Sequence, residues 1–304
     1  MSRRFIYLSK NLSNMNTAAQ EPDRIEINCA DGVSLVAHFF RRSVESTELP
    51  VLICPATGVK QHFYFRFASW LSEQGHDVLV FDYRGIGLSL RGELKRSQAS
   101  LEDWGCQDQV AALECLLART ASEQVVLLGH SAGGQMMGLM PNHAKIARVV
   151  GVSVSTGWFS RMRWAFSIKA RFGLRLFVPI GIKLLGYGPT AVIGLGENLP
   201  SRVALQWGEW CAAGGYATNA IRGRSEMDFH RDVGMPIIAF YAEDDDIANA
   251  KTVDNLMSTF PSAEKQVHCV RPAQFGLKSL GHIDWFRRSH QAVWPLLVQA
   301  IKSA

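Results

Sequence analysis

The residues best suited to chemistry in this chain surround one serine, Ser131. It lies in the run GHSAG, residues 129–133, directly after the apolar segment 125–128, which is expected to be a strand. A strand-to-helix turn that lifts a hydroxyl clear of a sheet needs small residues two positions before and after it, because larger side chains would collide. The glycines at 129 and 133 meet this need. The pattern therefore predicts a nucleophile elbow that presents the Ser131 hydroxyl, followed by a helix over 135–140.

A serine hydroxyl becomes a useful nucleophile only when a base accepts its proton. His282 is the candidate base, because it lies in a late loop before the last predicted helix, a position that none of the other eight histidines shares. Four consecutive carboxylates, residues 243–246, follow the apolar segment 237–241, and one of them is expected to orient the imidazole. Asp245 is the predicted acid, with Asp244 and Asp246 left as alternatives.

Acyl transfer also needs donors for the oxyanion of a tetrahedral intermediate. The backbone N–H groups of Ala132 and Thr57 are the predicted donors, and Gly58 or Val59 could replace Thr57 in the loop PATGV. Further predicted substrate contacts lie near the nucleophile, in this loop and among the aromatic residues farther along the chain. They are Gly58, Lys60, His130, Trp158 and Trp164.

Alternating elements are expected to position these residues. Segments 24–29 and 33–40 flank an Asp-Gly turn and predict an antiparallel hairpin. Short apolar runs typical of strands covered on both faces alternate with helical patterns. The runs are 51–54, 78–81, 125–128, 149–154, 237–241 and 266–270, and the helices include 65–74 and 285–301. This order predicts the α/β class, with a mostly parallel, doubly wound sheet and antiparallel N-terminal strands.

Regular alternation fails only between residues 156 and 235. That segment holds 11 aromatic residues, and its ten Lys and Arg against five Asp and Glu account for the net charge of +5 of the whole chain. We therefore expect an inserted helical cap at 156–235. The expected core is 22–155 together with 236–304, and residues 1–21 form a polar N-terminal arm.

Composition narrows the possible functions. With 47% hydrophobic and 19% charged residues among 304, the chain is typical of a globular protein. It has no long uncharged apolar run and no secretory signal pattern, so a cytoplasmic protein without a transmembrane segment is expected. Its six cysteines form no CxxC pair, and no metal site is predicted.

Dispersed basic residues argue against nucleic-acid binding. Leu90 breaks the GxGxxG pattern, which argues against a dinucleotide.

Several motifs together resemble the α/β-hydrolase superfamily from about residue 24 to the C-terminus. DYRGIGLS (82–89) resembles its DxRGxGxS stretch, while GHSAGG (129–134) and LGHIDWF (280–286) resemble its nucleophile and histidine regions. PATGV (55–59) with DYRGIGLS is similar to a bacterial subgroup of predicted hydrolases. One departure is that Pro55-Ala56 replaces the common His-Gly of the oxyanion loop. The resemblance implies an α/β-hydrolase fold and a serine hydrolase reaction, without a substrate.

The predicted function is therefore hydrolysis of a carboxylic ester, thioester or amide through an acyl-enzyme on Ser131, with His282 as base and Asp245 as its partner. No cofactor and no metal are expected. The aromatic residues of segment 156–235 favour a small, partly apolar substrate. Acyl transfer with the same residues and a noncatalytic ligand- or partner-binding protein on the same scaffold are the alternatives. No oligomeric state is predicted.

Overall fold

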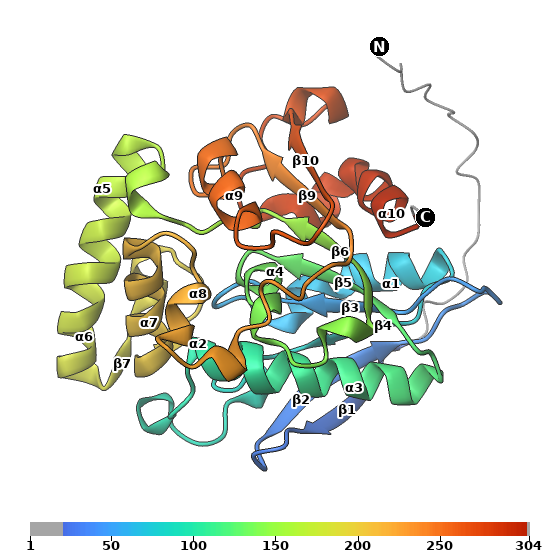
Figure 1. Ribbon diagram of the computed structural model, residues 1–304, viewed down its shortest axis with the longest axis horizontal. Coiled ribbons are helices and arrows are strands. Elements are labelled where there is room, and N and C mark those ends of the chain that lie inside the picture. Colours follow the sequence, from blue (N-terminus) through green and yellow to red (C-terminus); the bar gives the residue numbers. More distant parts are fainter. Residues whose placement is uncertain (1–20, 303–304) are drawn as a thin grey trace.

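The computed structural model describes residues 21–302, so all but the last residue of the predicted N-terminal arm (1–21) lies outside the described residues. Eight strands form one sheet in the order β1-β2-β4-β3-β5-β6-β9-β10 (Figure 1). The two N-terminal strands pair antiparallel, β2 joins β4 antiparallel, and the remaining pairs are parallel. This arrangement confirms the predicted fold class. The strands are β1 Asp23–Asn28, β2 Ser34–Phe40, β3 Val51–Cys54, β4 Val78–Phe81, β5 Val125–His130, β6 Ile146–Val152, β9 Ile237–Ala242 and β10 Lys265–Val270.

The sheet divides the core into two layers. β3, β4 and β5 are buried along their whole length, as expected of strands that are covered on both faces. Successive side chains alternate between the layers: Leu52 packs on one face, and Val51 and Ile53 pack on the other. Helices α1 (Phe65–Glu73) and α10 (Trp294–Lys302) cover the face of Val51. Helices α3 (Gln109–Thr120) and α9 (Ala250–Met257) cover the face of Leu52 (Figure 1).

The turn after β4 is held by buried charges. Asp82 accepts hydrogen bonds from the backbone N–H groups of Gln61, 2.8 Å away, and Leu88, 2.8 Å away. Arg84 forms ion pairs with the buried Asp108, at 2.6 Å, and with Asp31, at 2.5 Å. Asp82 therefore joins the end of β4 to the loop at Gln61, and Arg84 joins the same turn to Asp108 and Asp31.

Between β6 and β9 the chain leaves the sheet and forms mostly helix (Figure 1). Helix α5 (Trp164–Phe172) is joined to α6 (Val178–Leu185) by a π-helical turn, Gly173–Phe177, so the three segments form one continuous helix. We call this helix, residues 164–185, the outer helix. The segment also contains α7 (Ser201–Ala212), α8 (Thr218–Ile221) and a small antiparallel pair that was not expected, β7 (Tyr187–Gly188) with β8 (Leu199–Pro200).

Two predicted helices have a different extent in the structure. The segment 285–301 is α-helical only from Trp294, where α10 begins, and the residues before α10 form 3-10 turns. The α-helix does not begin earlier because the backbone is extended at Arg287 and departs from helical angles at His290. The predicted helix 135–140 is replaced by the short α4 (Ala132–Gln135) and a 3-10 turn, Met137–Leu139. The break lies at Met136, and a His230 ring fills the space that a side chain at Gly138 would need.

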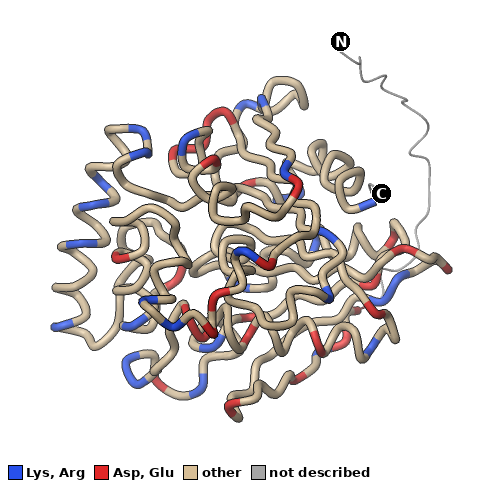
Figure 2. Tube along the Cα trace, viewed as in Figure 1, with Lys and Arg blue, Asp and Glu red and all other residues tan. Residues whose placement is uncertain are grey.

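Charge is unevenly distributed over the molecule. Figure 2 shows Lys and Arg, and no Asp or Glu, along the outer helix at the left of the view. Elsewhere residues of both signs are mixed. Among residues 21–302, none of the helices combines the length and the apolar character needed to cross a membrane.

Candidate active site

Ser131 stands at the sharp turn between β5 and α4. Its backbone has φ 48° and ψ −118°, a conformation that few residues other than glycine adopt. The neighbouring glycines make this turn possible. A Cβ atom on Gly129 would lie 2.3 Å from the Cα of Gly134, and one on Gly133 would lie 2.0 Å from the carbonyl oxygen of Cys54. The strained serine is therefore fixed by close backbone packing on both sides.

Three side chains from distant parts of the sequence form one hydrogen-bonded chain. Ser131 Oγ lies 2.9 Å from His282 Nε2, and His282 Nδ1 lies 2.8 Å from Asp245 Oδ2. A carboxylate only accepts hydrogen bonds, so the proton of the neutral imidazole resides on Nδ1. Nε2 is then free to accept the hydrogen of the Ser131 hydroxyl, which is the arrangement that general-base activation requires.

Asp245 is buried at the carboxyl end of β9. Its Oδ1 accepts hydrogen bonds from the N–H groups of Ile247, at 2.8 Å, and Ala248, at 2.9 Å. Burial alone would raise the pKa of this carboxyl. The charge and hydrogen bond of His282, together with the two backbone donors, outweigh burial and lower the pKa of Asp245 below its ordinary value. Asp245 is therefore held as an anion beside the imidazole.

The other carboxylates of the acidic run have different partners. Asp244 accepts hydrogen bonds from the N–H groups of Leu280, at 2.9 Å, and Gly281, at 3.0 Å, and so fastens the loop that carries His282. Asp246 is exposed and lies 3.6 Å from Arg163. Nowhere in residues 21–302 do three or more His, Cys, Asp or Glu side chains gather in a way that could hold a metal ion.

His130 connects the nucleophile strand to the histidine loop rather than facing the pocket. Its ring is fully buried; Nδ1 lies 2.8 Å from the Tyr64 hydroxyl and Nε2 lies 2.9 Å from the carbonyl oxygen of His282. The same Tyr64 hydroxyl accepts the Ala56 N–H at 2.9 Å. Tyr64 therefore donates to Nδ1, and the ring donates from Nε2. Burial first, and the nearby charge of His282 second, lower the pKa of His130 to about 3.

A small cavity, about 40 Å³ in volume, lies over Ser131 and His282. Gln135 and Tyr216 contribute polar side chains to its wall. Most of the remaining wall is apolar and comes from the segment between β6 and β9. These apolar residues include Met162, Phe166, Ala170, Leu174, Leu195 and Trp207.

The two predicted oxyanion donors follow two neighbouring strands of the sheet, β5 and β3. Ala132 is the first residue of α4, where a backbone N–H has no acceptor within its own helix. Thr57 is buried in the loop after β3, and its N–H makes no hydrogen bond to any residue in the range 21–302.

Tyr216, which is not among the residues predicted from the sequence, lies close to Thr57. Its hydroxyl is buried and has no hydrogen-bond partner among the described residues, although the Thr57 hydroxyl is near enough to influence its pKa. Burial raises that pKa well above its ordinary value, and Thr57 opposes this effect. Tyr216 lies in a stretch of the sequence without a motif or a regular apolar pattern, so no sequence signal could have identified it as a site residue.

The remaining predicted substrate contacts lie away from the cavity. Trp164 is 78% exposed on the outer helix, because that helix turns Phe166, Ala170 and Leu174 toward the cavity instead. Trp158 packs against Gly214 and under the Arg161 guanidinium.

Gly58 and Lys60 support a neighbouring loop rather than lining the cavity. The Gly58 carbonyl accepts the Glu197 N–H at 2.9 Å, and the Lys60 ammonium lies 2.9 Å from the Glu197 carboxylate. Leu195, two residues before Glu197, lines the cavity. The loop after β3 therefore holds part of the cavity wall in place.

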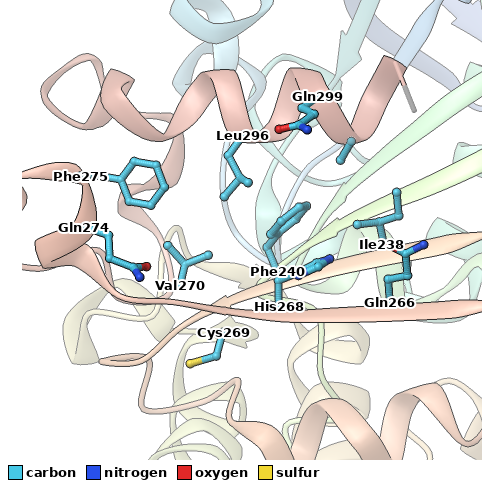
Figure 3. Close-up of a pocket in the computed structure, with 11 residues that line it drawn as sticks. Ile238, Phe240, Gln266, His268, Cys269, Val270, Gln274, Phe275, Leu296 and Gln299 are labelled. Atoms are coloured by element: carbon cyan, nitrogen blue, oxygen red, sulfur yellow. The ribbon is translucent and has the colours of Figure 1, made fainter. Parts of the chain in front are cut away.

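A second hollow lies between the edge strand β10 and helix α10 (Figure 3). Phe240, Val270, Phe275 and Leu296 give it apolar walls, and the His268 ring stacks on Phe240 at 5.2 Å. Neither Ser131 nor His282 contributes to it. The candidate chemistry therefore belongs to the cavity over Ser131.

Comparisons with known proteins identify the family and the fold. A family model described as "Alpha/beta hydrolase family" matches residues 51–294. A search of curated proteins finds no match to the sequence. Among solved structures, a soluble variant of monoglyceride lipase from Saccharomyces cerevisiae is 16% identical, with a TM-score of 0.60 over 97% of this chain and 100% of the other. An esterase from Pyrococcus furiosus is 13% identical, with a TM-score of 0.61 over 97% and 94%. At these identities, the likeness concerns the fold.

Proposed function

The chain belongs to the alpha/beta hydrolase family, and we propose that it is a serine hydrolase that cleaves a carboxylic ester through an acyl-enzyme on Ser131. The observation that carries this proposal is the pair of hydrogen bonds joining Ser131 Oγ to His282 Nε2, at 2.9 Å, and His282 Nδ1 to Asp245, at 2.8 Å. A nucleophile, a base and an oriented acid in this order constitute a catalytic triad.

In the first half of the reaction, Ser131 Oγ attacks the carbonyl carbon of the ester while His282 Nε2 takes the hydroxyl proton. The carbonyl oxygen becomes an oxyanion, which accepts hydrogen bonds from the N–H groups of Ala132 and Thr57. When the tetrahedral intermediate collapses, the bond to the alcohol oxygen breaks and His282 returns the proton to the departing alcohol. Ser131 is then acylated.

In the second half, His282 takes a proton from water as the water oxygen attacks the acyl carbon. The bond to Ser131 Oγ breaks, Oγ regains the proton from Nε2, and the carboxylic acid leaves. Asp245 stays ionised throughout and stabilises the imidazolium that forms twice in the cycle. Its lowered pKa fits this role.

Tyr216 adds a third donor in this proposal. Tyr216 lines the cavity over Ser131, and its buried hydroxyl has no hydrogen-bond partner among residues 21–302 and lies near Thr57, a predicted oxyanion donor. A substrate oxygen would satisfy it, because an unpaired buried hydroxyl is costly. In the same proposal His130 is a positioning residue, since its ring donates a hydrogen bond to the carbonyl oxygen of His282.

Residues 156–235 act as the cap in this account and select the substrate. Their apolar side chains over Ser131 favour an ester with an apolar acyl or alcohol part. Thioesters and amides would follow the same chemical steps, with a different leaving group. The cap side of the cavity is the part of the molecule that would discriminate among acyl chain lengths.

A series of p-nitrophenyl esters with increasing acyl length tests the proposal. The wild type is expected to release p-nitrophenol with an optimum above acetate, and Ser131→Ala is expected to lose at least about 10³-fold in kcat. Asp246→Asn is the matched control, because it changes an exposed carboxylate of the same loop. Equal activity of wild type and Ser131→Ala would refute the assignment, and release of a transesterified product with added alcohol would reveal acyl transfer.

A further inference from the structure

The outer helix carries an apolar stripe on its solvent side. Eight of the twelve large hydrophobic residues that are exposed within the described range lie between residues 164 and 192. Six of them recur at every fourth position, a spacing that places them along one side of a helix. We call these six residues the outer stripe: Trp164, Ile168, Phe172, Leu176, Ile180 and Leu184.

The π-helical turn helps to keep the six side chains of the outer stripe on one side of the helix. Side chains four residues apart drift gradually around an α-helix, because its turn holds 3.6 residues. The turn at Gly173–Phe177 takes up extra residues and offsets part of this drift in the middle of the helix. Trp164 at one end and Leu184 at the other are each 78% exposed. A contiguous exposed apolar surface of this kind marks an interaction site.

The same helix carries only positive charge. Between residues 156 and 196 the sequence contains six Lys and Arg and no Asp or Glu. Lys169, Arg175 and Lys183 are exposed and make no ion pair or hydrogen bond with any residue in the range 21–302. Each is adjacent in sequence to a residue of the outer stripe. Their flexible stems allow the charged ends to reach out beside the apolar side chains.

Apolar side chains flanked by unpaired cations fit one partner best, the surface of a bilayer that contains anionic lipids. A second copy of this chain fits less well, because a symmetric pairing would bring two arrays of positive charge face to face. We propose that the outer stripe, with Lys169, Arg175 and Lys183, is a membrane-docking surface. The apolar side chains would enter the interface while the three cations contact lipid phosphate and carboxylate groups.

This surface is next to the proposed active site. The opposite side of the outer helix, through Phe166, Ala170 and Leu174, forms the wall of the cavity over Ser131. Phe166 also lines a surface hollow with Trp164 and Lys169. Docking would therefore place the Phe166 side chain between the lipid and the cavity. The consequence for substrate, an ester drawn from the bilayer, rests on the proposed function, whereas the docking does not.

Vesicle flotation with the full chain tests the docking. The wild type is expected to float with vesicles of phosphatidylcholine mixed with phosphatidylserine, to float weakly with phosphatidylcholine alone, and to be released by salt. Ile168→Ser/Phe172→Ser/Leu176→Ser is expected to abolish binding. Lys169→Gln/Arg175→Gln/Lys183→Gln is expected to weaken it on the order of 100-fold, about fivefold for each cation, and to remove most of the salt dependence.

Matched controls separate docking from general effects of charge or folding. Arg66→Gln/Lys278→Gln/Arg288→Gln removes three exposed cations from other parts of the surface, and Val44→Ser/Leu88→Ser removes two exposed apolar side chains elsewhere. Both controls are expected to bind vesicles like the wild type. Circular dichroism and hydrolysis of a short, water-soluble ester establish that the docking variants remain folded.

Lipids brominated along their acyl chains give a direct readout of insertion. They are expected to quench tryptophan fluorescence in the wild type and to quench it much less in Trp164→Phe. Three results would overturn the proposal: no binding of the wild type to anionic vesicles at low salt, equal binding by the cation variant, or a concentration-dependent dimer that the apolar variant abolishes. Vesicle binding without ester hydrolysis would refute the proposed function and leave the docking intact.

Discussion

Asp244 and Asp245 are adjacent, yet they have different tasks. Asp245 contacts the imidazole of His282 through its side chain, and Asp244 holds the backbone of the loop that carries this histidine. Neighbouring residues of a loop point in different directions, so each carboxylate finds a separate partner. Asp246 faces solvent and Arg163.

This division predicts graded effects on activity. Asp245→Asn is expected to lower kcat about 10⁴-fold, because the amide no longer enforces the tautomer that lets Nε2 accept a proton. Asp246→Asn is expected to stay within about twofold of wild type, since its ion pair is exposed. Initial rates with a chromogenic ester measure both. Normal activity of Asp245→Asn together with a loss in Asp244→Asn would move the acid to the neighbouring residue.

His130 gives the protein a pH-dependent contribution to stability. The folded state lowers its pKa from 6.5 to about 3, so between these values the unfolded chain binds a proton that the folded chain does not. The stability that His130 contributes is complete above pH 6.5 and is lost as the pH falls toward 3. From about pH 7.5 to about pH 5 this loss amounts to about 2 kcal/mol.

Urea unfolding of wild type and His130→Gln at these two pH values measures this contribution. The wild type is expected to lose more stability than the variant by about 2 kcal/mol. His76 and His230, whose pKa values are lowered mainly by burial, are present in both proteins and cancel in the difference. An equal loss in both proteins would show that His130 does not remain neutral in the folded state.

Tyr216 is expected to act on the chemical step. Tyr216→Phe removes one hydroxyl without changing the ring, and we expect kcat to fall roughly 10- to 100-fold with little change in KM, as for loss of an oxyanion donor. Tyr187→Phe, at a tyrosine that does not line the cavity, is the control. A higher KM with an unchanged kcat would instead assign the Tyr216 hydroxyl to substrate binding alone.

At the scale of elements, the elbow depends on how closely β3, β5 and α4 approach one another. The nearest neighbours of Gly133 are backbone atoms of Cys54, which cannot move independently of β3. At Gly134 the nearest atom is a methyl group of Val154, which can shift more easily. The same substitution at the two positions therefore has different consequences.

Gly133→Ala is expected to destabilise the protein by about 3 kcal/mol or to prevent folding, because overpacking against backbone forces the strand to shift. Gly134→Ala is expected to cost less, about 1 kcal/mol. Urea midpoints compare the two variants, with thermal unfolding as a second measure. Equal stability of both variants would mean that the backbone packing at Cys54 is looser than the structure indicates.

The sequence predicts strands at this scale better than helix ends. Runs such as 51–54 and 78–81 are apolar throughout and bounded by polar or turn residues, so their limits agree with β3 and β4. The segment 285–301 has an apolar pattern typical of a helix. Its backbone departs from helical angles at Arg287 and His290, which no periodicity reveals.

At the scale of the whole molecule, distant segments meet at the carboxyl ends of the parallel strands. Ser131 follows β5, the acidic run follows β9 and Thr57 follows β3, so parallel pairing alone brings them to one edge of the sheet. This explains why these candidate residues could be predicted from the order of elements. Tyr216, Trp207 and Phe166 come from a segment without a repeating pattern, and their positions depend on helix packing that the sequence does not reveal.

Trp158 and Trp164 illustrate the same limit. Aromatic composition predicts that some residues of this segment face the nucleophile, and Phe166 and Trp207 do so. Which aromatic residues these are depends on the rotation of each helix about its axis. For the outer helix, that rotation directs Trp164 to solvent and leaves the exposed surface for which we propose a membrane partner.

The central claim is that Ser131 is a nucleophile activated by His282. Reaction with a fluorophosphonate, followed by intact-mass and peptide mass spectrometry, tests it most directly, because this reagent phosphonylates an activated serine without requiring the natural substrate. We predict one adduct per chain on the peptide containing Ser131, none in Ser131→Ala, and much slower labelling in His282→Gln. An unlabelled wild type, or equal labelling of wild type and Ser131→Ala, would contradict the account.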